Sequence, residues 1–525
     1  MSAEFAWLDG PLAYDRVPER FNMAAALLDR RLAAGDGARA AIVTPDRTLT
    51  YADVAAGVAR AAGALRRLGV QPEQRVAILL PDSPEFVFAF LGAMRAGMVP
   101  VPLSTLGTPD DQDYALRDSR AVALVVHERL QERVEPARRA VPTLRVCLAV
   151  GGAPAGTVPF EAACAAEDAA CDPAPTHRDD MAYWLYSSGT TGRPKAVVHL
   201  HHDMVFCVDP YVRHVLALGP DDRTFAVPRL FFSYGLTSCV YLPFWVGAST
   251  VLVAERPDPR GVFELLAKLR PTVFFSVPTS FAALLREAED APPDLSSLRL
   301  AVSAGEPLSV PLFHRWRERT GLELLDGLGA TEVGYIYISN RPGAVRPGAS
   351  GQLLPGFRAR VVGADGREAP AGTEGELWMS GESLAAGYWN KHERTRAAFV
   401  GEWYRTGDRY HVDADGYYVY HGRADDLLRV GANWVSPLEV EAALLEHPAV
   451  SECAVVGRRD ADGLEKPRAF VVPRPGAPVD GLEADLIAHA RARLAPYKAP
   501  RWVAVVAELP KTATGKVQRY RLRVE

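Results

Sequence analysis

The sequence predicts an α/β protein with a large, layered α/β domain at the N-terminus, which includes a strand-rich subdomain, and a small α+β domain at the C-terminus. Short apolar runs alternate with amphipathic helical patterns from about residue 50 to residue 304. Glycine-rich turns and short alternating runs dominate after about residue 345. From residue 437 onward the pattern is helix, strand, strand, helix. A chain of 525 residues with 48% hydrophobic content is long enough to form more than one domain.

The elements of the large domain follow from these runs in chain order. We expect a strand at 76–80, a helix at 84–97 and a strand at 121–126. Further buried strands are expected at 182–186, 225–228, 249–254, 273–277 and 298–303, with a helix at 261–269. The turn signals Asp365-Gly366 and Asp415-Gly416, with the alternating run 375–379, predict the strand-rich subdomain.

The small domain is expected to contain a helix at 438–446, strands at 451–456 and 469–473, and a helix at 483–494. Its boundary falls near the polar segment 422–426. The sequence therefore predicts a large domain over residues 1–424 and a small one over residues 425–525.

Charge and cysteine usage narrow the class of protein. A formal net charge of −5 offers no general basic surface for a nucleic-acid backbone, so we expect no nucleic-acid partner. The six cysteines are scattered without a C-x-x-C pair, which favours reduced thiols. Neither a secretory signal nor a membrane span is evident, so we expect no membrane association and a cytoplasmic location.

The segment Ser187-Ser188-Gly189-Thr190-Thr191-Gly192-Arg193-Pro194-Lys195 follows a predicted strand and suits a polyphosphate. Its small residues let backbone amides approach an anion, its hydroxyls can donate, and it supplies one cation. Lysine is scarce, with only seven in the chain, so one retained here is notable. Pro194 precedes the lysine and Ala196 follows it, which does not match a Walker A loop. A glycine-rich surface turn is the alternative interpretation.

This segment resembles the signature loop of the adenylate-forming superfamily, which includes acyl-CoA synthetases, carrier-loading adenylation domains and luciferases. Five further segments match the superfamily in the expected order: 303–307, 326–332, 404–408, 422–426 and 510–516. The resemblance covers nearly the whole chain. It implies that the chain activates an acid with ATP and magnesium by forming an acyl-adenylate.

The resemblance also implies a role for each matching residue. The β- and γ-phosphates would be held by Ser187, Ser188, Gly189, Thr190, Thr191, Gly192 and Lys195. The residues implied at the adenine are Ala304, Gly305, Glu306, Asp326, Gly327 and Gly329. Thr331 would donate to phosphate and Glu332 would bind magnesium, while Asp408 would bind the ribose with help from Arg423.

The small domain would supply the catalytic lysine, Lys516, and would rotate about Asp425 between the two half-reactions. An exposed charged tail and an exposed turn are the alternative interpretations of these two positions. The domain is therefore expected to be mobile.

Segments 20–24, 230–235, 254–257 and 434–441 resemble the benzoate-CoA ligases in particular. That branch implies a pocket for an aromatic acid formed by Phe232, Ser233, Tyr234, Gly329, Gly334, Tyr335 and Ile336. Benzoate-CoA ligases typically carry Met-Leu-His after the Thr-Glu pair, whereas this chain has Val333-Gly334-Tyr335. The expected acid is therefore benzoate or a hydroxy-, amino- or methyl-substituted benzoate.

The acceptor of the acyl group is expected to be coenzyme A, which would enter a tunnel beside Gly431 and Ala432. Ala432 stands where the family usually has glycine, so a carrier-protein phosphopantetheine, and with it an acyl carrier protein as partner, or an amine are the alternatives. A nucleotide-binding paralogue without turnover and a luciferase-like oxidation of the adenylate are alternatives of other classes.

The segment His199-Leu200-His201-His202-Asp203 invites a metal-site interpretation. We expect a helix here, on which adjacent histidines could not all face one ion. The sequence therefore favours ordinary structural histidines.

Overall fold

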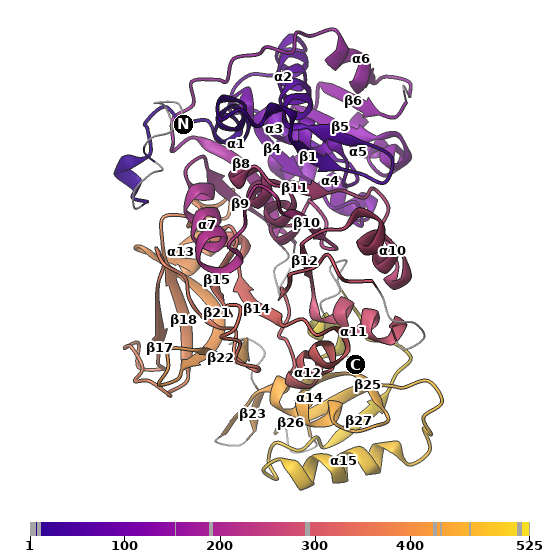
Figure 1. Cartoon of the computed structure of the whole chain (residues 1–525). Coiled ribbons are helices and arrows are strands. Elements are labelled where there is room, and N and C mark those ends of the chain that lie inside the picture. The colour runs from indigo at the N-terminus through magenta and orange to yellow at the C-terminus, as the bar shows by residue number, and fades with distance from the viewer. Residues whose placement is uncertain are drawn as a thin grey trace. The chain divides into compact units, whose positions relative to one another are not determined.

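The computed structural model of the chain describes residue 7 and residues 12–152, 154–187, 193–288, 294–423, 428–430, 433–460, 464–511 and 517–523. The chain forms two compact units (Figure 1). The first comprises residues 1–188, 194–358 and 380–404, and the second comprises residues 189–193, 359–379 and 405–525. Within the described residues, no helix combines the length and apolar character required to cross a membrane.

One sheet of the first unit is parallel, with strand order β4-β3-β5-β6-β7. Its strands are β3 (Arg75–Leu79), β4 (Val99–Pro102), β5 (Ala123–His127), β6 (Val146–Val150) and β7 (Val158–Pro159). The helices of this region are α1 (Met23–Ala33), α2 (Tyr51–Arg67), α3 (Pro84–Arg95), α4 (Pro109–Ser119), α5 (Glu135–Ala140) and α6 (Phe160–Ala165). The predicted strands 76–80 and 121–126 and the predicted helix 84–97 are thus confirmed to within about two residues at each end.

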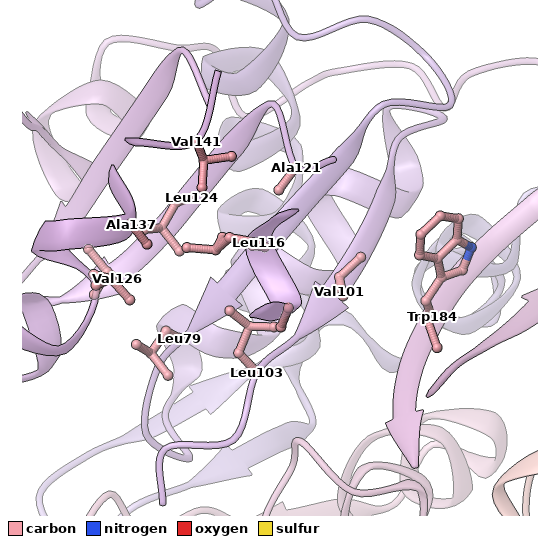
Figure 2. Close-up of a cluster of buried hydrophobic side chains, with 14 of the residues drawn as sticks. Leu79, Val101, Leu103, Leu116, Ala121, Leu124, Val126, Ala137, Val141 and Trp184 are labelled. Carbon is pink, nitrogen blue, oxygen red and sulfur yellow. The ribbon is translucent and has the colours of Figure 1, made fainter. Parts of the chain in front are cut away.

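Figure 2 shows the core of this region, where Leu79, Val101 and Leu124 project from the strands. Leu116 of α4 packs against them, and Trp184 joins the cluster from a neighbouring strand. Continuous apolar runs such as 76–79 are buried on both faces because helices cover a parallel sheet.

The second sheet of this unit has nine strands in the order β16-β15-β14-β13-β12-β10-β11-β1-β2. Their bounds are β1 (Ala40–Val43), β2 (Thr48–Thr50), β10 (Arg223–Ala226), β11 (Ser249–Val251), β12 (Val273–Ser276), β13 (Leu300–Ala304), β14 (Leu324–Gly329), β15 (Ile336–Ser339) and β16 (Gln352–Leu353). The pairs from β1 to β14 by way of β11, β10, β12 and β13 are parallel, and the outer pairs are antiparallel. The connecting helices include α10 (Pro259–Leu269), α11 (Pro278–Glu287) and α12 (Val310–Thr320). Since the central strands are parallel, their carboxyl ends share one edge, where ligands bind in open α/β sheets.

A third, antiparallel sheet of the first unit has the order β19-β9-β8. It contains β8 (Met181–Ser187), β9 (Lys195–Leu200) and β19 (Gly387–Tyr388). Helix α7 (Asp203–Tyr211) follows, and this unit also contains α8 (Ser233–Leu236), α9 (Leu242–Val246), α13 (His392–Ala398) and β20 (Phe399–Val400). The prediction of a helix over 199–203 was wrong, because residue 199 lies on β9 and the helix begins at residue 203.

One sheet of the second unit contains an antiparallel hairpin of β21 (Trp403–Val412) and β22 (Tyr418–Arg423). Strand β18 (Gly375–Ser380) lies beside β21, and β17 (Arg358–Val362) lies beside β18. The Asp413 carboxylate accepts hydrogen bonds from the amides of Asp415 and Tyr417, and Gly416 has a φ of 80°. The predicted Asp415-Gly416 turn is therefore confirmed as the tip of this hairpin.

The rest of the second unit is α+β. Strand β25 (Val450–Arg459) pairs antiparallel with β26 (Glu465–Pro473), and β27 (Trp502–Val505) pairs parallel with β26. Helices α14 (Pro437–Leu445), α15 (Leu482–Arg493) and α16 (Arg519–Leu522) and the hairpin of β23 (Leu428–Val430) and β24 (Asn433–Val435) accompany this sheet. Val440, Leu444, Val471 and Leu486 are buried together in its core. The predicted α+β character is confirmed, although β27 was not foreseen.

Candidate active site

The predicted phosphate segment starts at the last residue of β8 and ends at the first residue of β9. Ser187 ends β8 and pairs with Lys195, the first residue of β9. The Tyr114 hydroxyl donates a 2.8 Å hydrogen bond to the Pro194 carbonyl and so anchors the chain beside Lys195. The predicted phosphate-binding residues at positions 188–192 lie outside the described residues.

The Lys195 ammonium lies 3.0 Å from the carboxylate of Glu332. The Tyr388 hydroxyl lies between them: Lys195 donates to it at 2.6 Å, and it donates to the Glu332 carboxylate at 2.9 Å. Tyr388 and Glu332 are each only 6% exposed. The structure therefore brings together two residues predicted from motifs far apart in sequence, and adds a third that the sequence did not reveal.

The charge of Glu332 is stabilised by this arrangement. Burial alone would raise the pKa of its carboxyl group, but the charge and hydrogen bond of Lys195 and the hydroxyl of Tyr388 lower that pKa below its ordinary value. Glu332 therefore presents an oriented carboxylate whose ionised form is stabilised, which is the kind of group that a hard cation prefers.

The fit of Glu332 to magnesium can be judged from its surroundings. Within the described ranges, no three His, Cys, Asp or Glu side chains gather into a metal cluster. Magnesium bound with nucleotides usually takes one or two protein carboxylates and its other oxygens from phosphates and water, and Glu332 is one carboxylate that could serve this mode.

The backbone beside Glu332 is held by a buried histidine. Nε2 of His199 lies 2.7 Å from the carbonyl oxygen of Thr331, and Nδ1 lies 2.8 Å from a carboxylate oxygen of Asp203. Because a carbonyl can only accept, Nε2 carries a proton and donates to it. The ring stacks on Tyr183 with centroids 4.9 Å apart. His199 and Asp203 thus orient the Thr331-Glu332 turn, a role that sequence reasoning missed.

Of the neighbouring histidines, His202 also contacts Asp203, whereas His201 has a different partner. Nδ1 of His201 accepts a hydrogen bond from the Met23 amide, and burial lowers the pKa of this imidazole to about 3. His202 contacts the Arg178 carbonyl at 3.0 Å. Each ring of the segment therefore has a structural contact of its own.

The residues predicted at the adenine lie at the carboxyl ends of β13 and β14. Register pairs Ala304 with Gly327, and Gly305 follows directly after β13. The Glu306 carboxylate accepts a 2.6 Å hydrogen bond from the Thr279 hydroxyl. Gly329 ends β14, where a Cβ would lie 2.9 Å from the Tyr335 carbonyl oxygen. A side chain at Gly329 would therefore collide with the returning backbone.

Asp326 is the buried acid of β14. Its Oδ1 has no hydrogen-bond partner in the described part of the chain. Burial raises the pKa of this carboxyl group to about 8, against a smaller lowering by the Gly327 amide. Burial therefore favours the protonated form of Asp326, which can act as a hydrogen-bond donor.

The residues predicted to form the aromatic-acid pocket also lie together in the first unit. The Tyr335 hydroxyl is 2.7 Å from that of Ser238, and its ring lies 6.0 Å from the ring of Tyr234. The Tyr234 hydroxyl lies 3.0 Å from the Val302 carbonyl, and the Ser233 hydroxyl donates to the Gly334 carbonyl. These hydroxyls are already engaged by protein groups, which leaves ring surfaces as the main feature that this cluster offers.

The backbone conformation at position 334 favours glycine, and the space around it is already filled. Its φ is 90°, and a Cβ there would lie 3.1 Å from the Cys207 sulfur. Ile336 is buried and pairs with Gly329 across β15 and β14. Phe232 is partly exposed and packs its ring 4.2 Å from that of Phe231.

In the second unit, Asp408 and Arg423 pair across β21 and β22. Nη1 of Arg423 lies 3.3 Å from the Asp408 carboxylate and 3.0 Å from the Thr406 carbonyl. The Thr406 hydroxyl donates to the Leu377 carbonyl at 2.8 Å and accepts from the Asp408 amide at 3.0 Å. The Thr-Gly-Asp turn is thus held in one conformation.

The predicted hinge Asp425, the tunnel residues Gly431 and Ala432, and the predicted catalytic residue Lys516 lie outside the described residues. The segments that flank position 516 are described. Lys511 and Val517 form an antiparallel bridge, and Lys511 makes a 2.6 Å ion pair with Glu452. Lys511 is thereby joined to β25 of the second unit.

Tyr388 left no local signal in the sequence. It lies 193 residues from Lys195 and 56 from Glu332, and its short strand has only two residues. His199 and Asp203 were visible as a pair four residues apart, but the wrong helix prediction concealed their contact.

Comparison with known proteins was consistent with these features. The sequence profile described as AMP-binding enzyme matches residues 29–389, and that of the AMP-binding enzyme C-terminal domain matches residues 439–516. The chain is 45% identical to benzoate–CoA ligase of Thauera aromatica over 97% of both chains. It is 43% identical to a 4-hydroxybenzoate–CoA/benzoate–CoA ligase of Rhodopseudomonas palustris, over 96% of this chain and 94% of the relative.

Among solved structures, the anthranilate CoA ligase AuaEII in complex with anthranoyl-AMP superimposes with a TM-score of 0.92. The two chains are 40% identical, and the match covers 98% of each. The resemblance to the adenylate-forming superfamily and the predicted fold class are therefore confirmed.

Proposed function

Since the chain belongs to the family of AMP-binding enzymes, we propose that it is an AMP-forming ligase that joins benzoate or a substituted benzoate to coenzyme A. In the first half-reaction, a carboxylate oxygen of the acid attacks the α-phosphorus of ATP. The bond from that phosphorus to the bridging oxygen breaks, and pyrophosphate leaves. In the second, the thiolate of coenzyme A attacks the acyl carbon, AMP leaves with the electron pair of the broken carbon–oxygen bond, and the thiol proton passes to solvent.

The observation that most supports the first half-reaction is the buried contact of Lys195 with Glu332 beside the carboxyl end of β14. Such a site places an ammonium group that can donate hydrogen bonds beside an ionised carboxylate. The two groups together can orient a metal-bound triphosphate. Magnesium bound there would neutralise phosphate charge, with Glu332 as its protein ligand. Asp408 and Arg423 are proposed at the ribose and Lys516 at the α-phosphate.

The aromatic acid is supported by the relatives, whose names specify benzoate, 4-hydroxybenzoate and anthranilate. It is also supported by the rings of Tyr234 and Tyr335, which suit a flat apolar ligand. Because the Tyr335 hydroxyl is engaged by Ser238, we favour benzoate over an acid whose substituent must be bound by that phenol. The Cys207 sulfur, 3.1 Å from where a Cβ on Gly334 would lie, leaves little room for a side chain at that position.

The test is incubation of the full chain with ATP, magnesium and one acid at a time, with and without coenzyme A. The acids are benzoate and its hydroxy-, amino- and methyl-substituted forms, and mass spectrometry follows AMP, the acyl-adenylate and the thioester. We expect benzoyl-CoA and AMP in equal amounts. Adenylate without thioester would refute coenzyme A as acceptor, and no AMP with any acid would refute the ligase assignment.

A further inference from the structure

Tyr388 occupies a position that the proposed reaction does not explain. Its hydroxyl is an acceptor toward Lys195 at 2.6 Å and a donor toward Glu332 at 2.9 Å, while those two groups are themselves 3.0 Å apart. A hydroxyl is the smallest side-chain group that can accept from a cation and donate to an anion at once. The three groups form a closed triangle in a nearly buried environment.

We propose that Tyr388 is a positioning residue for magnesium and the ATP triphosphate. Its hydroxyl keeps the side chains of Lys195 and Glu332 oriented when their ion pair separates. This inference rests on the proposed function, because it assumes that Lys195 turns to phosphate and Glu332 to magnesium when nucleotide binds.

The need for such a group follows from the energetics of buried ion pairs. A carboxylate and an ammonium that pair away from water are costly to separate, because each loses its counter-charge without regaining full hydration. Nucleotide binding has to separate this pair, or at least lengthen it. The Tyr388 hydroxyl can retain a hydrogen bond to either group during that change, so neither is left without a polar partner.

The hydroxyl is placed independently of the pair that it serves. Tyr388 lies on β19, which pairs with β9 just after Lys195, and the Trp389 amide donates to the Ala196 carbonyl at 3.0 Å. The Trp389 indole donates to the Asp118 carbonyl at 2.9 Å, and the Lys391 ammonium lies 2.8 Å from the Asp118 carboxylate. Backbone pairing and a separate ion pair thus hold the segment that carries Tyr388.

The same acid also reaches the other side of the phosphate segment. The Tyr186 hydroxyl donates to Asp118 at 2.9 Å, and Tyr186 precedes the last residue of β8. Asp118 therefore joins the strand that enters the phosphate segment to the one that carries Tyr388. The position of Tyr388 is therefore fixed by the strands that flank the phosphate segment.

The experiment compares wild type with Tyr388→Phe, which removes one oxygen and keeps the ring that contacts Phe399 at 5.5 Å. Calorimetry measures the binding of a non-hydrolysable ATP analogue with magnesium, of the same analogue without magnesium, and of AMP. We expect Tyr388→Phe to weaken binding of the magnesium-bound analogue by about 10-fold or more, because hydrogen bonds to charged groups are lost. AMP, which has no β- or γ-phosphate, should bind as it does to wild type.

The matched control is Tyr241→Phe, since the Tyr241 hydroxyl is buried and has no hydrogen-bond partner among the described residues. It should leave all three affinities unchanged. If Tyr388→Phe weakened AMP as much as the magnesium-bound analogue, a general structural role would replace the proposal.

A double-mutant cycle with Glu332 adds a second, independent test of the proposal. In the Glu332→Gln background, the further effect of Tyr388→Phe on magnesium dependence should shrink by at least half, because the two residues act through one contact. Additive effects would overturn the proposal. Wild-type assays with benzoate run in parallel: absence of product with intact magnesium–nucleotide binding would refute the proposed function alone.

Discussion

Replacing Asp326 by Asn tests whether the buried acid of β14 carries a proton at neutral pH. Burial raises its carboxyl pKa to about 8, against an ordinary value of 3.8. Oδ1 lacks a partner in the described structure, and the Gly327 amide offsets only a smaller part of the cost of burying the charge. The substitution keeps the shape of the side chain and removes only the titratable group.

The sign and size of the effect follow from proton linkage. The folded pKa is raised, so between about pH 4 and pH 8 the folded chain holds a proton that the unfolded chain has released. The free energy of unfolding of wild type therefore falls as pH rises through this window, and Asp326→Asn escapes that fall. From pH 5 to pH 9 the stability of the variant relative to wild type should rise by about 4 kcal/mol.

The assay is guanidinium denaturation of wild type and Asp326→Asn at pH 5, 7 and 9. Asp221→Asn is the control, because the Asp221 side chain is 97% exposed and its ion pair with Arg39 lies at the surface. We expect the control to follow wild type at every pH. A difference between Asp326→Asn and wild type that is the same at pH 5 and pH 9 would refute a raised pKa at Asp326.

Three further outcomes are expected. Gly329→Ala should lower stability by about 1–3 kcal/mol, since its Cβ would meet the Tyr335 carbonyl oxygen at 2.9 Å; an unchanged melting temperature would contradict this. Tyr335→Phe should cost about 1–3 kcal/mol, because it leaves the buried Ser238 hydroxyl without its partner; denaturation against wild type measures it, and equal stability would disprove it. Lys516→Ala should reduce benzoate-dependent exchange of pyrophosphate into ATP by at least about 100-fold. The control Lys498→Ala, which removes an ion pair with Glu439 and a contact with the Tyr497 ring, should not. Full exchange in the first variant would remove Lys516 from catalysis.

Much of the fold could be read from local patterns. The predicted strand 273–277 is β12 at Val273–Ser276, and the predicted helix 261–269 is α10 at Pro259–Leu269. The spacing of apolar residues and the turn residues indicate which face of a segment is buried. This information is local and does not depend on the segments that pack against it. The wrong helix over 199–203 shows the limit of this information, since the polar His199 faces inward from a strand.

In the candidate site, too, some residues could be predicted from the sequence and others could not. Lys195 and Glu332 were recognisable because each belongs to a motif of contiguous residues, and the family assignment followed from the order of those motifs. Their 3.0 Å contact depends on β9 and the end of β14 coming together, which no local pattern encodes. Tyr388 could not be predicted from the sequence, because its contacts with Lys195 and Glu332 arise only when distant segments come together in the fold.

The sequence by itself therefore determined the class of fold, the family and the residues that belong to motifs. Only the tertiary structure decided that the Tyr388 hydroxyl joins Lys195 to Glu332, that His199 holds the Thr331 carbonyl, and that Cys207 fills the space beside Gly334. The physical reason is that hydrogen bonding and close packing act over a few ångströms between residues that can be hundreds of positions apart. The segment between β8 and β9 predicts a triphosphate site from its sequence, but the contacts of its lysine depend on the tertiary structure.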